Sequence, residues 1–86
     1  MNMRIEQLPY ERIRNLRQDA DLTQEDVAKY LNVSQNTYSQ YETGTLRFSL
    51  EVVIKLALYY HTSVDYLVGL TDERKPYPRK RKDKNA

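Results

Sequence analysis

Cysteine is absent from this chain of 86 residues, and no apolar run is long enough to span a membrane. Without cysteine, neither a disulfide framework nor a thiolate metal site can form. The N-terminus also lacks the apolar h-region of a signal peptide. These absences predict a soluble, cytoplasmic protein that does not enter a membrane.

Residues with catalytic chemistry are equally scarce. His61 is the only histidine, and no second type of metal ligand stands beside it. The chain has two glycines, so it contains no glycine-rich loop that could cradle a phosphate. A chain of this length forms one small domain with a modest core, which leaves no room for a substrate cleft. We therefore expect no enzyme, no metal, no cofactor and no small-molecule ligand, and a binding function is favoured.

Charge is unevenly distributed along the chain, although the formal net charge is only +2. Residues 74–86 contain seven Lys or Arg and one acidic residue, Asp83, so their net charge is +6. The rest of the chain contains seven basic and eleven acidic residues, so its net charge is −4. An acidic body opposes nucleic-acid binding, because phosphate contacts supply most of the nonspecific affinity. Residues 72–86 contain two prolines and no apolar period, so we expect a basic, disordered tail that either contacts phosphates or only adds solubility.

The most informative stretch runs from Thr23 to Gly44 and predicts two short helices joined by a tight turn. Residues 23–26, TQED, fit the capping box that opens a helix. Asn32 tolerates the left-handed conformation that ends a helix, and Ser34 is a second N-cap. The apolar face of the first helix is formed by Val27, Ala28 and Leu31.

The second helix of the pair, Ser34–Glu42, has an unusual composition, because its apolar stripe consists only of Tyr38 and Tyr41. The opposite face is nearly uncharged and carries Gln35, Asn36, Ser39 and Gln40. Amide side chains can read the edge of adenine in the major groove with two hydrogen bonds. A solvated polar face is the alternative, but the position behind a capped helix and a short turn favours DNA reading.

Three more helices are expected around this pair. Residues 1–8 have no clear hydrophobic period, and we expect them to form a flexible lead-in. Pro9 suits the start of a helix that runs to about Ala20. Ser49 and Ser63 are expected to be the N-caps of two later helices. Inward-facing positions are expected at Ile13 and Leu16, at Leu50, Val53, Ile54, Ala57 and Tyr60, and at Val64, Leu67 and Val68. Further apolar residues widen the stripe of the Ser49 helix beyond one face: Leu56, Leu58 and Tyr59.

Five segments, taken in order, resemble the Cro and phage-repressor-like helix-turn-helix domains, also called the XRE family. The matching text is RIRNLR at 12–17, LTQEDVAKYLNVS at 22–34, YSQYETG at 38–44, SLEVVIKLA at 49–57 and SVDYLVG at 63–69. The resemblance implies a compact, all-α, five-helix domain over residues 9–71, with the helix-turn-helix at its second and third helices. It also implies a sequence-specific DNA-binding transcriptional regulator, of repressor type, that binds double-stranded DNA as a homodimer on a near-palindromic operator.

The resemblance and the residue types together suggest roles for individual positions. Base reading is expected from Gln35, Asn36 and Gln40, with Ser39 or Thr37 assisting. Phosphate contacts are expected from Gln24, Ser34, Thr43, Thr45 and Arg47. In the family, a basic residue at the position of Arg17 pairs with the acid at the position of Glu42. Residues left over on the last two helices could form an apolar dimer interface, or could simply stay partly exposed: Leu58, Tyr59, Tyr66 and Leu70.

A different class of function fits part of the same sequence. The fold could serve as a protein-interaction module, such as an antitoxin or an antagonist of a regulator. The acidic balance outside residues 74–86 favours this alternative, whereas the amide-rich face of residues 34–42 opposes it.

Overall fold

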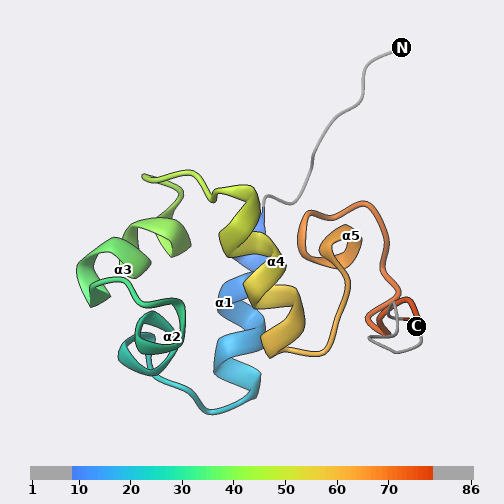
Figure 1. The fold of residues 1–86 in the computed structure, drawn as a ribbon, viewed down its shortest axis with the longest axis horizontal. Helices are drawn as coiled ribbons and strands as arrows, with labels where there is room; N and C mark the ends of the chain where they lie inside the picture. Colours follow the sequence, from blue (N-terminus) through green and yellow to red (C-terminus); the bar gives the residue numbers. More distant parts are fainter. Residues whose placement is uncertain (1–8, 79–86) are drawn as a thin grey trace, which may run out of the picture.

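The computed structural model describes residues 9–78, which form five helices and no strand (Figure 1). The helices are α1 (Pro9–Asp19), α2 (Gln24–Leu31), α3 (Gln35–Thr43), α4 (Leu50–Tyr59) and α5 (Val64–Leu67). The expected all-α, five-helix domain is therefore confirmed. The predicted lead-in, residues 1–8, and most of the basic run, residues 79–86, lie outside the described residues.

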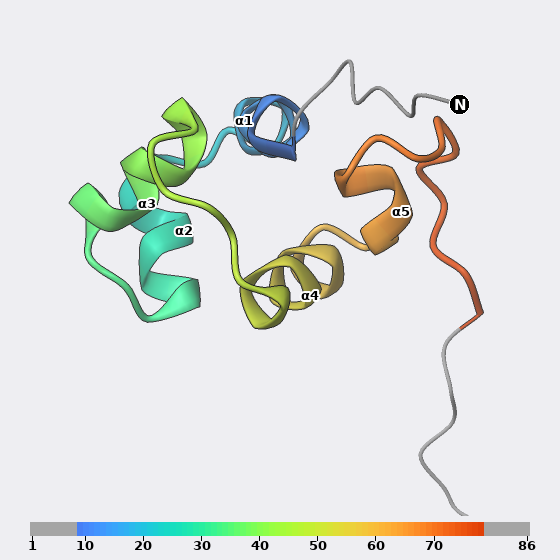
Figure 2. The same cartoon turned by 90° about the horizontal axis from the view of Figure 1, so that it is seen from above.

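The helices are arranged around α1 and α4, which cross the middle of the molecule in Figure 1. The view from above in Figure 2 separates α1 from α4 and places α2 and α3 together at one end. α5 and the chain that follows it lie at the opposite end in both views. α3 packs against both α2 and α1, while α5 packs against α4 and α1. The outer side of α3 is thus left at an end of the molecule.

The helix ends are set by short-range contacts that the sequence predicted. Thr23 Oγ1 accepts a hydrogen bond from the Asp26 amide at 3.0 Å, and Asp26 Oδ2 accepts one from the Thr23 amide at 2.9 Å. Asn32 ends α2 in the left-handed conformation with φ of 62°, and Gly44 ends α3 with φ of 81°. Ser34 caps α3 through its side chain. The predicted capping box, left-handed residue and second cap are all confirmed.

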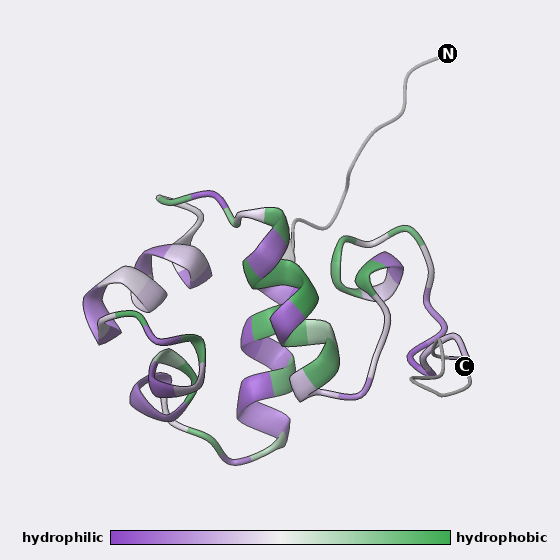
Figure 3. Ribbon diagram, in the orientation of Figure 1, coloured by the Kyte–Doolittle hydropathy of each residue, from purple (hydrophilic) through white to green (hydrophobic). Residues whose placement is uncertain are grey.

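The core gathers apolar residues from all five helices: Ile13, Leu16, Val27, Ala28, Leu31, Tyr38, Tyr41, Val53, Leu56, Ala57 and Leu67. In α4 the expected inward stripe is partly wrong, because Leu50 is 71% exposed and Ile54 is 43% exposed, while Leu56 is fully buried. α4 is apolar around most of its circumference, so its sequence does not define one inner side. Packing on the rest of the domain selects Val53, Leu56 and Ala57, and hydrophobic segments remain on the visible side of α4 in Figure 3.

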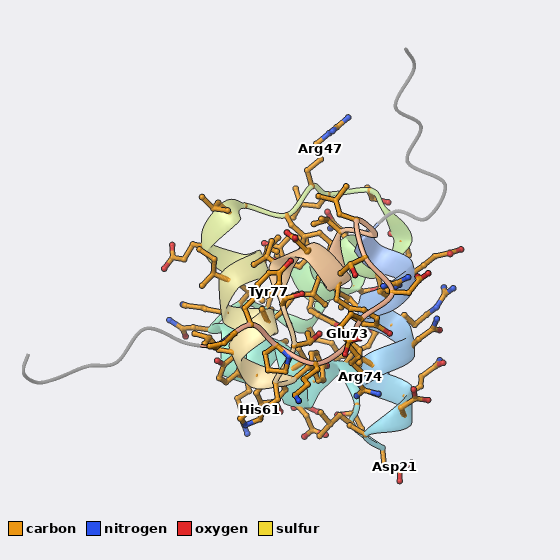
Figure 4. The ribbon with its side chains drawn as sticks, turned by 90° about the vertical axis from the view of Figure 1, so that its right-hand side faces the viewer. Asp21, Arg47, His61, Glu73, Arg74 and Tyr77 are labelled. Carbon is orange, nitrogen blue, oxygen red and sulfur yellow. The ribbon has the colours of Figure 1, made fainter. Side chains whose placement is uncertain are left out.

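Part of the chain after α5 lies against the domain, beyond the predicted domain end at residue 71. The Thr62 hydroxyl donates to the carbonyl of Arg74 at 2.7 Å, and the Tyr77 hydroxyl donates to Asp65 Oδ2 at 2.7 Å. Figure 4 shows Arg74 and Tyr77 along this side of the molecule. Proline and charge near residue 76 predicted disorder, and the two hydrogen bonds link this segment to residues 12 positions earlier in the chain. Contacts with the helical domain therefore continue past residue 71 as far as Tyr77.

Candidate nucleic-acid interface

The outward side of α3 carries the residues that the sequence selected for base reading. Gln35 and Asn36 are exposed, and Ser39 and Gln40 are half-buried. Within residues 9–78, the structure assigns no hydrogen bond to the side-chain amides of Gln35, Asn36 or Gln40. These amides can therefore meet donors and acceptors on another molecule. Thr37 is half-buried, and its hydroxyl oxygen accepts a hydrogen bond from the Ser34 hydroxyl at 2.9 Å.

The outer side of α3 carries no charged side chain. Glu42 is the only charged residue of α3, and it is 3% exposed because it turns toward α1. Tyr38 and Tyr41, on the same inner side, are 0% and 7% exposed. The outer side of α3 consequently presents amides and hydroxyls without a carboxylate that would repel phosphate.

Glu42 ties three helices together through its carboxylate. Arg17 of α1 donates from Nε to Oε2 at 2.6 Å and from Nη2 to Oε1 at 3.0 Å, so the expected pair is present in bidentate form. Gln24 of α2 donates from Nε2 to Oε1 at 3.1 Å. The Tyr38 hydroxyl, one turn earlier in α3, donates to Oε2 at 2.5 Å. The third Arg17 nitrogen, Nη1, donates to the carbonyl of Leu22, ahead of α2, at 2.9 Å.

The ionisation of this cluster follows from its contacts. Burial alone would raise the pKa of Glu42, but the hydrogen bonds from Arg17, Tyr38 and Gln24 outweigh burial and hold that pKa below its ordinary value. The hydrogen bond to Glu42 raises the pKa of Arg17. Burial, and then the hydrogen bond to Glu42, raise the pKa of Tyr38. The carboxylate therefore stays charged and the phenol stays protonated, which fixes the orientation of α3 against α1 and α2.

Two of the expected phosphate contacts are modified by these neighbours. Gln24 is half-buried and spends one of its two amide N–H groups on Glu42, which leaves one N–H for an outside acceptor. The Ser34 hydroxyl donates to Thr37 Oγ1 and accepts from the Thr37 amide at 3.0 Å, so its proton is already used within the cap. Any contact from Ser34 to a phosphate would have to use a group other than this hydroxyl proton.

The loop between α3 and α4 supplies the remaining candidates. The hydroxyls of Thr43 and Thr45 lie 2.9 Å apart, and both residues are exposed. Arg47 is exposed and points away from the body of the molecule (Figure 4). The loop is held in place behind them, because the rings of Tyr41 and Phe48 stack with centroids 4.7 Å apart. An anchored loop beside α3 thus presents one guanidinium to the outside.

The four residues suggested for a dimer interface differ in exposure and in their intrachain contacts. Leu58 is 47% exposed and Leu70 is 61% exposed. The ring of Tyr59 is stacked on that of Tyr30, with centroids 4.1 Å apart. The Arg12 guanidinium lies over the ring of Tyr66, 4.1 Å from its centroid. Tyr59 and Tyr66 therefore each have an intrachain partner on one ring face and remain half-buried, and an interface through these four residues stays a prediction.

The sequence did not anticipate several of these contacts. The hydrogen bond between Tyr38 and Glu42 could have been found, because residues four apart on a helix face each other. The contacts of Arg12 could not, since its guanidinium donates to the carbonyls of Tyr66 and Thr71 at 2.8 and 2.9 Å, more than 50 positions away. Among residues 9–78, no cluster of three His, Asp or Glu could hold a metal ion, and no helix has the length and apolarity to cross a bilayer.

Comparison with known proteins identifies the class. The chain matches the family described as helix-turn-helix over residues 13–67, from the second turn of α1 to the end of α5. Because this match covers more than half of the chain, the protein belongs to that family, in its Cro and phage-repressor-like (XRE) branch.

Two similar proteins carry names of transcriptional regulators. The chain is 47% identical over 58 residues to the cryptic phage CTXphi transcriptional repressor RstR of Vibrio cholerae, a match that covers 67% of this chain and 52% of the relative. It is 36% identical over 66 residues to the uncharacterized HTH-type transcriptional regulator YobD of Bacillus subtilis, covering 77% of this chain and 59% of the relative. The chain thus spans between half and three fifths of the length of these relatives.

A solved structure shares the fold. The P22 c2 repressor protein, crystallised in complex with a synthetic operator, superimposes with a TM-score of 0.66 at 32% sequence identity. The match covers 72% of this chain and 94% of that chain.

Proposed function

We propose that this protein is a sequence-specific DNA-binding transcriptional regulator of repressor type. In this proposal, residues 34–42 enter the major groove of double-stranded DNA, and the protein acts as a homodimer on a near-palindromic operator. One observation carries the proposal: the amides of Gln35, Asn36 and Gln40 have no hydrogen-bond partner among residues 9–78, and Gln35 and Asn36 are exposed. The names of the relatives and the operator in the P22 c2 complex support it.

The chemistry of the α3 side fits base edges. A Gln or Asn amide offers one donor and one acceptor in a plane, which matches N6 and N7 of adenine. Each such contact discriminates between bases by about 1–3 kcal/mol. Ser39 and Thr37 add hydroxyls that can donate or accept. Because the Glu42 cluster anchors α3 to α1 and α2, these side chains are presented from a rigid element.

Phosphate contacts position the protein on the duplex. We assign this role to Thr43, Thr45 and Arg47 of the loop after α3, with the remaining N–H of Gln24 on the neighbouring helix. Only Arg47 among them is charged, so the loop neutralises few phosphates. We therefore expect modest nonspecific affinity from residues 9–78 and a large share of the specificity from α3.

The direct test is a footprinting titration with duplexes from the DNA upstream of the protein's own gene. Unrelated duplex in excess serves as the competitor, at a fixed and stated salt concentration. The proposal expects a protected site, with two similar half-sites whose centres lie about one helical turn apart. Retention of no duplex above the competitor would show that the protein does not read sequence.

A protein-interaction module is the second candidate function. Two observations favour it: the net charge of −4 outside residues 74–86, and the exposed apolar residues of α4. The same titration separates the two functions, because an interaction module would leave every duplex free.

A further inference from the structure

An apolar stripe runs along the outer side of α4. Leu50, Ile54 and Leu58 are spaced four residues apart, and they are 71%, 43% and 47% exposed. Positions with this spacing lie on one side of a helix. We call these three residues the α4 stripe. Large apolar side chains seldom line up in solvent unless another surface covers them.

The α4 stripe continues into a groove of about 300 Å³. Its lining includes Ile54 and Leu58 of α4 together with Pro76 and Tyr77 of the segment after α5. Tyr77 is 62% exposed, and its hydrogen bond to Asp65 holds it beside α5. The stripe and the groove together make one apolar surface on the side of α4 that the core does not use.

We propose that the α4 stripe packs against the same stripe of a second copy of this chain, with the two α4 helices antiparallel about a two-fold axis at Ile54. The order leucine, isoleucine, leucine is the same in both directions along the helix. Reversal therefore places Leu50 opposite the position of Leu58 and Ile54 opposite itself, which is the self-complementarity that a two-fold contact requires. No other partner is needed to explain this symmetry.

Charge beside the stripe is also self-complementary. Glu51 and Lys55 lie one turn apart on α4, with Lys55 Nζ 3.6 Å from Glu51 Oε2. Reversing one of two antiparallel helices brings the acidic turn of each toward the basic turn of the other. The contact thus has apolar residues at its centre and pairs of opposite charges at its edge, as in self-associating helices.

The position of α4 is compatible with DNA reading, and the inference deepens the proposed function by assigning the surface of the homodimer. Figure 2 places α4 at one side of the molecule and α3 at an end of it. A two-fold axis that relates antiparallel helices lies in their contact plane and runs across them. Because α3 lies away from this contact, both copies of α3 remain uncovered, as two half-sites on one duplex demand.

Disulfide trapping tests the axis directly, because the natural chain has no cysteine. Ile54→Cys in the full chain, under mild oxidation and without DNA, should form a covalent dimer, since residues beside a two-fold axis approach their own copies. Leu70→Cys is the matched control, an exposed leucine outside the stripe. Trapping through Leu70→Cys and not through Ile54→Cys would overturn the proposal.

Charge reversal at the same position gives an independent readout. Sedimentation equilibrium should show the natural chain as a dimer and show self-association about 30-fold or more weaker for Ile54→Glu and Ile54→Lys. An equimolar mixture of these two variants should restore the dimer, because the opposite charges then meet at the axis. Leu70→Glu should associate like the natural chain, and circular dichroism should show that every variant is folded.

Three results would refute the interface. The first is a natural chain that stays monomeric at high concentration, which would leave the stripe to a different protein. The others are an undisturbed dimer in Ile54→Glu, and the absence of a dimer in Leu70→Glu. None of these measurements uses DNA, so they stand apart from the footprinting test. A trapped dimer that binds no duplex refutes the proposed function alone, whereas a bound duplex without the α4 interface refutes this inference alone.

Discussion

Glu42, near the end of α3, and Arg17, in the last turn of α1, form a bidentate ion pair whose shorter contact is 2.6 Å. Both side chains are largely withdrawn from water, at 4% and 13% exposed. Pairing removes the only charge of α3 from the surface and holds that helix at a defined angle. Stability and the presentation of α3 therefore depend on one carboxylate.

Glu42→Gln should lower the free energy of unfolding by about 3 kcal/mol, because Arg17 would keep a shielded charge without its counter-charge. Arg17→Met should cost a similar amount. The double variant should lose clearly less free energy of unfolding than the sum of the two single losses, as expected for residues that touch each other. Urea unfolding followed by circular dichroism measures all three; additive losses would show that the two residues do not interact.

Low pH should remove the contribution of the Glu42 carboxylate to the stability of the fold. Its pKa is depressed in the folded protein, so the unfolded chain binds the proton more readily than the folded one. The stabilisation is present above the unfolded pKa of about 4.3 and is lost as the pH falls below it toward the folded pKa. The difference in stability between the natural chain and Glu42→Gln should therefore be constant near neutrality and shrink in acid. Asp26, whose pKa is lowered mainly by its hydrogen bond with the Thr23 backbone, is common to both chains and cancels.

Removing the hydroxyl of Tyr38 and removing that of Tyr60 should have different effects on stability. Tyr38→Phe loses a hydrogen bond to a charged acceptor and should destabilise the fold by about 1.5–3 kcal/mol. Tyr60 is a matched case, because its hydroxyl is buried without a hydrogen-bond partner among residues 9–78. Tyr60→Phe should be neutral or slightly stabilising, since no bond is broken and a desolvated group is removed. Thermal unfolding of the two variants side by side checks the contrast, which fails if both are destabilised equally.

Base reading by α3 predicts a selective loss. Gln35→Ala should weaken binding to the operator by about 1–3 kcal/mol and relax the preference at one base pair, with little effect on random duplex. Gln18→Ala, an exposed glutamine of α1, is the control and should leave both affinities unchanged. Equal losses on operator and random DNA would reassign Gln35 to the phosphate backbone.

The basic run predicts a salt effect. A chain that ends at residue 78 keeps the hydrogen bonds of Thr62 and Asp65 with the C-terminal segment and should remain folded. It lacks five of the seven basic residues of positions 74–86. If these residues meet phosphates, the plot of log affinity against log salt should flatten by about one unit for each phosphate that the shortened chain no longer neutralises. An unchanged slope would show that residues 79–86 touch no phosphate.

Local signals explain how far the sequence could be interpreted. The capping box at Thr23, the left-handed Asn32 and the cap at Ser34 involve neighbours within a few residues, so they were predictable without any tertiary information. The amide-rich side of α3 was visible for the same reason. The ion pair of Arg17 and Glu42 was expected only through the resemblance, since nothing local connects residues 25 positions apart.

Long-range packing decided the rest. Arg12 pairs with Asp72 at 2.8 Å across 60 positions, a contact that no local signal in the sequence could predict. Tyr59 and Tyr66 have intrachain partners, Tyr30 and Arg12, which spacing along a helix cannot reveal.

The amino-acid order alone determined where helices begin and end and which side of α3 is polar, because caps, turns and helical periodicity are short-range effects. Only the folded molecule decided which side of α4 is buried, since a helix that is apolar nearly all round has no preferred inner side until its neighbours cover one. That choice buried Leu56, left Leu50, Ile54 and Leu58 in solvent, and so created the surface on which a second copy can pack.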